Sequence, residues 1–94
     1  MHNYEVIVIL HPDLDETAAN GFVDKVKGWV TDAGGTVDKV DLWGRRRLAY
    51  TIRKVREGQY FLVNAQMKPS FTAELERSLR LSEPVLRYSI IAVD

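Results

Sequence analysis

The chain of 94 residues is long enough for one compact domain and too short for two, and 46% of its residues are hydrophobic. Thirteen basic and thirteen acidic side chains cancel, which by itself argues against a nucleic-acid partner. The charges are unevenly distributed, however: acidic side chains outnumber basic ones in residues 1–41, and basic side chains outnumber acidic ones in residues 42–94. The absence of cysteine excludes disulfides, thiolate metal sites and a cysteine nucleophile.

No apolar run approaches the roughly 18–20 residues of a transmembrane helix, and the longest, at residues 6–10, has the length of a strand. The N-terminal segment lacks the basic, apolar and small-residue blocks of a secretory signal. We therefore expect a complete, soluble and untargeted protein of the cytoplasm, with no membrane partner.

The first half of the chain reads as strand, helix, strand. Residues 4–10 are apolar on both alternating faces, which is typical of a central strand. Asp13 or Asp15 then caps a helix whose apolar positions recur every three or four residues up to position 33, and Gly34-Gly35 ends it. Residues 36–43 alternate as a strand with one wet face does, and Gly44 marks a bulge or bend.

The second half completes this second strand and then reads as strand, helix, strand. Residues 48–52 resume the alternation, residues 53–58 are predicted as the hairpin tip, and residues 59–67 as the third strand. Ser70 is predicted to cap a second helix that carries Phe71, Leu75 and Leu79 on one face. Residues 85–93 form the fourth strand after the break at Pro84.

This order, β-α-β-β-α-β, predicts one α+β domain over residues 1–94 with the ferredoxin-like sandwich fold. Its four-stranded antiparallel sheet has the order 4-1-3-2, with both helices on one face. The other face is left bare for a partner. On the third strand we expect the mixed set to face outward, away from the helices: Tyr60, Leu62, Asn64 and Gln66.

No pattern of an active site is present. His2 and His11 are the only imidazoles, and neither adjoins a serine or a pair of carboxylates at useful spacing. Asp13, Asp15 and Glu16 lack the length and central glycine of a calcium loop and suit a helix N-terminus instead. We therefore predict no enzyme, no catalytic or metal-binding residue, no cofactor and no small-molecule substrate.

The strongest chemical signal is basic, with six cations in residues 45–56. Five are arginines, whose planar fork binds phosphates and stacks on bases. Two interpretations remain open: the segment binds RNA or another acidic partner, or it is a solvated edge that discourages strand pairing. The six are Arg45, Arg46, Arg47, Arg53, Lys54 and Arg56.

Aromatic residues on the strands add a further hypothesis. Tyr4 and Tyr60 lie on neighbouring central strands and could form a base-stacking platform like that of an RNA-recognition motif. Residues 57–63 match that module's third-strand motif poorly, so core or partner-facing positions are the alternative. Trp29 is expected in the core, and Trp43 either in the core or as an exposed edge contact.

Four segments carry a more specific pattern: MHNYEVIVIL at residues 1–10, GRRRLAYTI at 44–52, EGQY at 57–60 and LRLSEPVLR at 79–87. In this order and spacing they resemble the bacterial ribosomal protein S6 family, the sixth protein of the small ribosomal subunit. The resemblance spans essentially the whole chain. It implies a structural, ribosome-bound protein that binds the central domain (the platform) of small-subunit rRNA together with ribosomal protein S18.

The resemblance also implies two sets of contact residues. Those expected at the rRNA are His2, Asn3, Tyr4, Arg45, Arg46, Arg47, Arg53 and Arg87. Those expected at the partner protein are Trp43, Leu48, Tyr50, Ile52 and Tyr60. Residues 92–94 should lie beside the N-terminal contact. Thr51 stands where the family usually has proline, and His2-Asn3 replaces a more basic pair, which predicts a weaker RNA contact there.

Two other functions share the same order of elements. A ligand-sensing module of the ACT type needs a polar or glycine-rich loop after the first strand, and His11-Pro12-Asp13 does not supply one. An acylphosphatase-like enzyme needs a phosphate-cradling loop with an arginine at that place, and residues 10–16 contain none. Fold alone does not separate these functions from RNA binding.

Overall fold

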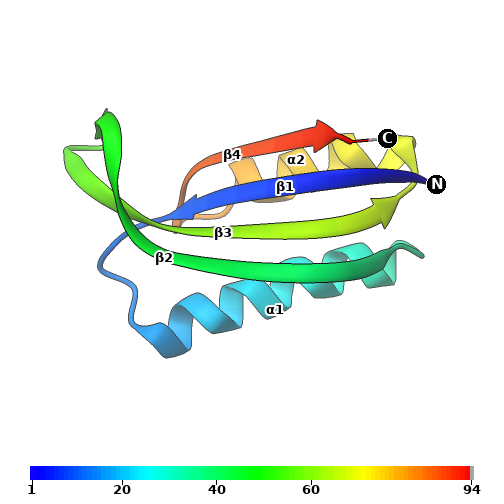
Figure 1. The fold of residues 1–94 in the computed structure, drawn as a ribbon, viewed down its shortest axis with the longest axis horizontal. Coiled ribbons are helices and arrows are strands. Elements are labelled where there is room, and N and C mark those ends of the chain that lie inside the picture. The colour runs from blue at the N-terminus through cyan, green and yellow to red at the C-terminus, as the bar shows by residue number, and fades with distance from the viewer. Residues whose placement is uncertain (94) are drawn as a thin grey trace.

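A computed structural model describes residues 1–93. The antiparallel sheet has the order β2-β3-β1-β4, and both helices cover one of its faces (Figure 1). The elements are β1 (His2–Leu10), α1 (Glu16–Asp32), β2 (Thr36–Ile52), β3 (Val55–Met67), the 3-10 turn η1 (Pro69–Phe71), α2 (Thr72–Arg80) and β4 (Val85–Ala92). The predicted ferredoxin-like fold and its strand order are confirmed.

The core lies between the helices and the sheet face that they cover. Alternate residues of β1 and β3 are buried there, because successive side chains of a strand point to opposite faces. From α1 and α2 the buried residues are Phe22, Val23, Val26, Val30, Leu75 and Leu79. Tyr60, Leu62 and Asn64 remain partly exposed on the bare face, so the predicted orientation of the third strand is confirmed.

The ends of α1 follow the predicted signals. Asp15 rather than Asp13 is the N-cap, since its Oδ1 accepts a hydrogen bond of 2.8 Å from the Ala18 N–H. Gly34 follows the C-cap with a φ of +85°. Trp29 is only half-buried, at the rim of the core, where its ring meets that of Phe22 edge-on at 6.0 Å.

The predicted hairpin tip at residues 53–58 is wrong. β2 runs without a break to Ile52 and β3 begins at Val55, so the turn consists of Arg53 and Lys54 alone, with φ values of 49° and 65°. Gly58 is buried within β3, where an added Cβ would lie 2.4 Å from the Ile9 side chain. A side-chain-free position under close packing, rather than a turn, explains this glycine.

β2 and β3 do not pair in a single register. The ladder shifts between Val37 and Lys39, again between Leu42 and Gly44, and a third time between Arg47 and Ile52. The second shift confirms the bulge predicted at Gly44, which has a φ of +76°.

The start of α2 also differs from the prediction. Ser70 lies inside η1 and does not cap the helix, because Pro69 begins a 3-10 turn that leads directly into it. The Thr72 hydroxyl donates to the Pro69 carbonyl at 2.8 Å.

The C-terminal residues lie beside the start of β1, as predicted. Ala92 pairs with Tyr4, and the Val93 N–H donates to the Asn3 carbonyl at 3.0 Å. Asp94, the last residue of the predicted contact, lies outside the described residues.

Candidate nucleic-acid and protein interface

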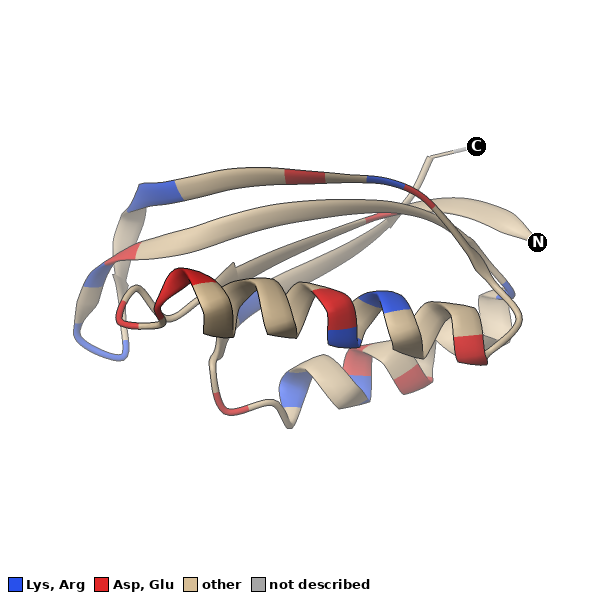
Figure 2. Ribbon diagram, turned by 90° about the horizontal axis from the view of Figure 1, so that it is seen from below, with Lys and Arg blue, Asp and Glu red and all other residues tan. Residues whose placement is uncertain are grey.

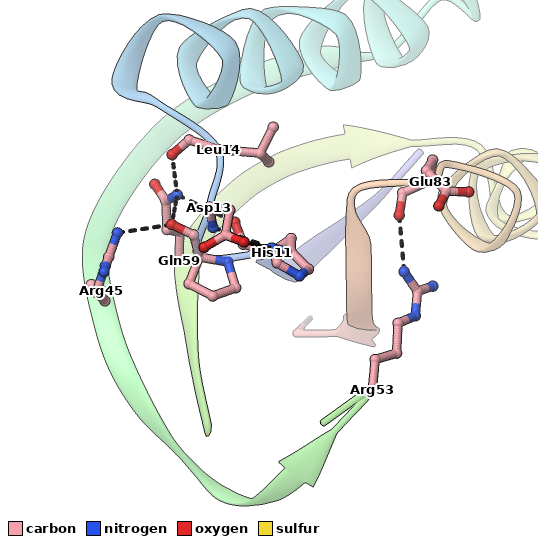
Figure 3. A network of polar contacts seen from close by, with 8 residues as sticks. His11, Asp13, Leu14, Arg45, Arg53, Gln59 and Glu83 are labelled. Atoms are coloured by element: carbon pink, nitrogen blue, oxygen red, sulfur yellow. Dashed lines mark hydrogen bonds and ion pairs between the residues drawn. The ribbon is translucent and has the colours of Figure 1, made fainter. Parts of the chain in front are cut away.

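The β2–β3 hairpin extends past the sheet and curls around the loop that follows β1 (Figures 1 and 3). We call residues 44–60 the arm. At its tip, Arg53 donates to the carbonyls of Glu83 at 3.0 Å and Val85 at 3.1 Å. The tip of a hairpin that begins at one edge of the sheet is thereby fastened to the other edge strand, β4.

The inner side of the arm holds the loop after β1 by side-chain bonds to backbone carbonyls (Figure 3). The Gln59 amide donates to Leu14 at 2.7 Å and to His11 and Pro12 at 3.3 Å each. Arg45 donates to the Pro12 carbonyl at 2.8 Å. The four contacts fix residues 11–14 against the arm, although their partners lie more than thirty residues apart in the sequence.

These bonds leave the positive charge of the arm uncompensated. Arg45 and Arg53 donate to neutral carbonyls, and Glu57 faces Arg47 in the ladder beyond ion-pair distance. Within residues 1–93, none of the six cations of the arm pairs with a carboxylate. Figure 2 shows basic segments gathered at the arm, whereas acidic segments recur along α1. The arm therefore presents a positive field to its surroundings.

Two arginine–aromatic pairs lie beside this charge. The Trp43 ring stacks on Tyr60 with centroids 6.2 Å apart, and the Arg46 guanidinium lies 5.4 Å from the Trp43 centroid. In the second pair, Arg87 of β4 lies 5.5 Å from the Tyr50 centroid and donates to its hydroxyl. Trp43 is 38% exposed and Tyr50 61%, so both rings remain accessible.

Not every predicted contact residue is on the surface. Leu48 is buried, with its Cδ2 3.5 Å from the Cβ position of Gly58, and Ile52 is half-buried. Tyr4 is 9% exposed on the helix-covered face, whereas Tyr60 lies on the bare face. The stacking platform proposed for these two tyrosines is therefore wrong, because a β-strand's alternation puts them on opposite sides of the sheet.

The remaining predicted residues fall into two groups. Arg45, Arg46, Arg47, Arg53, Arg87, Trp43, Tyr50 and Tyr60 gather at the arm and the adjoining start of β4. His2 and Asn3 lie at the opposite end of the sheet, where β1 begins (Figure 1). Sequence reasoning missed Gln59, although its position two residues before the buried Phe61 places a polar side chain on the covered face of β3 and could have signalled a buried hydrogen-bonding role.

Other chemistries find no support in the part of the chain that the structure describes. No three His, Asp or Glu side chains among residues 1–93 are grouped as metal ligands. Over the same residues, no helix has the length and apolar character needed to cross a membrane.

Comparison with known proteins points to one family. Residues 3–92 match the family model described as ribosomal protein S6. The small ribosomal subunit protein bS6 of Clostridium acetobutylicum is 47% identical over 94 residues, covering 100% of this chain and 99% of that one. The corresponding protein of Moorella thermoacetica is 45% identical over 94 residues, covering 100% and 96%. The crystal structure of 30S ribosomal protein S6 from Thermotoga maritima superposes with a TM-score of 0.93 at 28% identity, covering 98% of this chain and 87% of that one.

Proposed function

Because the chain belongs to the ribosomal protein S6 family, a family of structural and not catalytic proteins of the small ribosomal subunit, we propose that it binds the central domain of small-subunit rRNA together with ribosomal protein S18. The observation that supports this most strongly is the arm, whose six cations have no carboxylate partner among residues 1–93 and which projects from the sheet beside exposed aromatic rings. Uncompensated arginines attract phosphates, and exposed aromatic rings are typical anchors of protein interfaces.

Within the arm we assign the RNA contact first to Arg46 and Arg47, which make no hydrogen bond to the loop after β1. Arg45 and Arg53 each retain donors for phosphate but also hold the arm in place. The proposed partner surface consists of Trp43, Tyr50 and Tyr60. Leu48 is buried and Ile52 half-buried, so these two residues are left out of the proposed surface.

A second rRNA contact is proposed at the start of β1. His2 and Asn3 are exposed there, at the end of the sheet away from the arm (Figure 1). The Tyr4 side chain is left out of this contact because it packs in the core.

The test measures binding of a central-domain rRNA fragment with and without ribosomal protein S18, at several salt concentrations. We expect weak binding by the chain alone and a clear gain in affinity with S18. The affinity should fall as salt rises, because each neutralised phosphate contributes about 0.7–0.9 to the slope of log K against log salt concentration. A lack of enhancement by S18 would refute the proposed cooperation.

A matched pair of variants then tests the arm. The double variant Arg46→Glu/Arg47→Glu leaves Arg45 and its bond to Pro12 intact, and we expect it to abolish assembly while the fold survives. The control Lys25→Glu/Lys27→Glu makes the same change of charge on α1 and should assemble nearly normally. If the arm variant assembles as well as the control, the basic segment is only a solvated edge.

Trp43→Ala tests the partner surface separately. Trp43 is exposed and stacks on Tyr60, and Arg46 beside its ring keeps its charge when the ring is removed, so the variant should change RNA binding by the isolated chain only slightly. We expect it to remove most of the gain that S18 provides, as loss of an interfacial aromatic anchor does. An undiminished gain would place the S18 contact elsewhere.

A further inference from the structure

A hollow of about 250 Å³ lies beside β4, and three arginines from different elements line it. Arg53 comes from the tip of the arm, Arg80 from the last turn of α2 and Arg87 from β4. The other lining residues are Leu79, Val85, Leu86 and Tyr88. Arg53 reaches the hollow because the arm curls across to β4, so the closed arm completes it.

The arginines that line the hollow keep hydrogen-bond donors that the bonds described above do not use. A guanidinium carries five N–H groups, of which Arg53 spends two on the carbonyls of Glu83 and Val85 and Arg87 one on the Tyr50 hydroxyl. These acceptors are uncharged, so neither arginine is neutralised. No carboxylate is among the described residues that line the hollow.

Arg80 has one acidic neighbour. Its Nη1 lies 3.9 Å from Glu76 across one helical turn, with the two side chains 60% and 50% exposed. An ion pair that long and that exposed is readily exchanged for a better partner. The Glu76 carboxylate also accepts a hydrogen bond of 3.1 Å from Tyr88, another lining residue, and so lies near the hollow without lining it.

We propose that this hollow binds a phosphate group. Three arginines line this one hollow, and phosphate oxygens can take charge-assisted hydrogen bonds from several guanidinium groups at once. Resting on the proposed function, the phosphate belongs to the rRNA backbone and is a contact additional to those of Arg46 and Arg47. Arg80, to which neither the sequence pattern nor the proposed interface gave a role, becomes an RNA-contacting residue.

The helix itself supplies a matched control. Arg77 and Arg80 both lie in the last turn of α2, where a cation suits the negative end of the helix dipole. Only Arg80 lines the hollow. The variants Arg80→Gln and Arg77→Gln therefore remove the same charge from the same turn and differ in access to the proposed site.

The experiment measures the affinity of each full-length variant, with S18, for the central-domain rRNA fragment at several salt concentrations. We expect Arg80→Gln to weaken binding roughly three- to tenfold and to lower the salt slope by about 0.7–0.9, the loss of one phosphate contact. Arg77→Gln should change affinity less than about twofold. Glu76→Gln, which releases Arg80 from its carboxylate, should strengthen binding. Equal effects of Arg80→Gln and Arg77→Gln would overturn the proposal, because they would reflect overall charge alone.

A titration with inorganic phosphate, followed by the arginine Nε–H resonances, separates the possible sources of the phosphate. Phosphate-induced shifts at Arg80 and Arg87 in the wild type, with the Arg87 shift lost in Arg80→Gln and the RNA affinity of that variant unchanged, would support a site for a free phosphate instead of the RNA backbone. No shift and no RNA effect would overturn the proposal. If the wild-type chain with S18 fails to bind the RNA at all, the proposed function fails, and the phosphate titration still tests the hollow.

Discussion

The hydrogen bonds from the Gln59 side chain to the loop after β1 are the contacts whose removal is easiest to interpret. The variant Gln59→Met keeps the length of the side chain and removes only the amide. The Leu14 carbonyl loses this donor, whereas the Pro12 carbonyl keeps the bond from Arg45 and the His11 carbonyl keeps the bond from the Leu14 N–H. We expect the loop to loosen and the protein to lose stability.

The size of the loss follows from the geometry. The amide nitrogen has two hydrogens for three acceptors, so the contacts amount to two hydrogen bonds at most, of which the 2.7 Å bond to Leu14 is the strongest. At about 1 kcal/mol of net stability for each part-buried bond, the variant should lose about 2 kcal/mol. For a domain of this size that corresponds to a fall of roughly 8–16 °C in Tm.

Gln66 provides the control because it lies on the same strand with the same side chain. Its amide reaches only Asp38, at 3.4 and 3.5 Å, on an exposed surface. Gln66→Met should therefore change stability by less than about 0.5 kcal/mol. Urea unfolding gives both values, and hydrogen exchange of the amides of residues 11 and 13–15 reports the loop directly. Equal losses in the two variants, or unchanged exchange in Gln59→Met, would refute the reasoning.

Three further variants test the packing around the arm and the helix start. Gly58→Ala places a Cβ 2.4 Å from the Ile9 side chain and should cost about 1–3 kcal/mol in urea unfolding, whereas a neutral result would mean that Ile9 moves aside freely. Leu48→Ala should lower the free energy of unfolding by about 2 kcal/mol in calorimetry, near the lower end for a buried leucine because Leu48 lies at the edge of the core. A loss under about 0.5 kcal/mol would show that its packing does not stabilise the arm. Asp15→Ala removes the N-cap of α1, whose carboxylate accepts from the Ala18 N–H, and should lower the free energy of unfolding by about 1 kcal/mol. Asp13→Ala serves as its control, because Asp13 does not cap the helix.

The elements that the sequence predicted correctly are those whose signals are local. Hydrophobic alternation and helical spacing located the four strands and α1, and the alternation of β3 identified which of its faces meets the helices. The glycine pair after α1 marked its end because a left-handed residue there is available chiefly to glycine. Such features need no information about the rest of the chain.

The features that escaped prediction depend on tertiary contacts. Arg53 and Lys54 carry no sequence signal for a two-residue turn, since glycine and asparagine usually fill such positions, so Gly58 was taken as part of the tip. The hydrogen bonds from Gln59 and Arg53 to carbonyls far away in the sequence can form only when the arm curls around the loop. For the same reason, the basic segment was correctly singled out while the division of its arginines between structure and surface could not be foreseen.

The register shifts in β2 also bear on the solubility of the free protein. A 17-residue edge strand presents unpaired backbone N–H and C=O groups with which a second chain can pair, and this favours aggregation. The register shifts at Val37–Lys39 and Leu42–Gly44 divide that edge into short regular stretches, so an approaching strand finds no long continuous ladder to extend. The irregularities that help shape the arm should therefore also keep newly made chains apart until they join the ribosome.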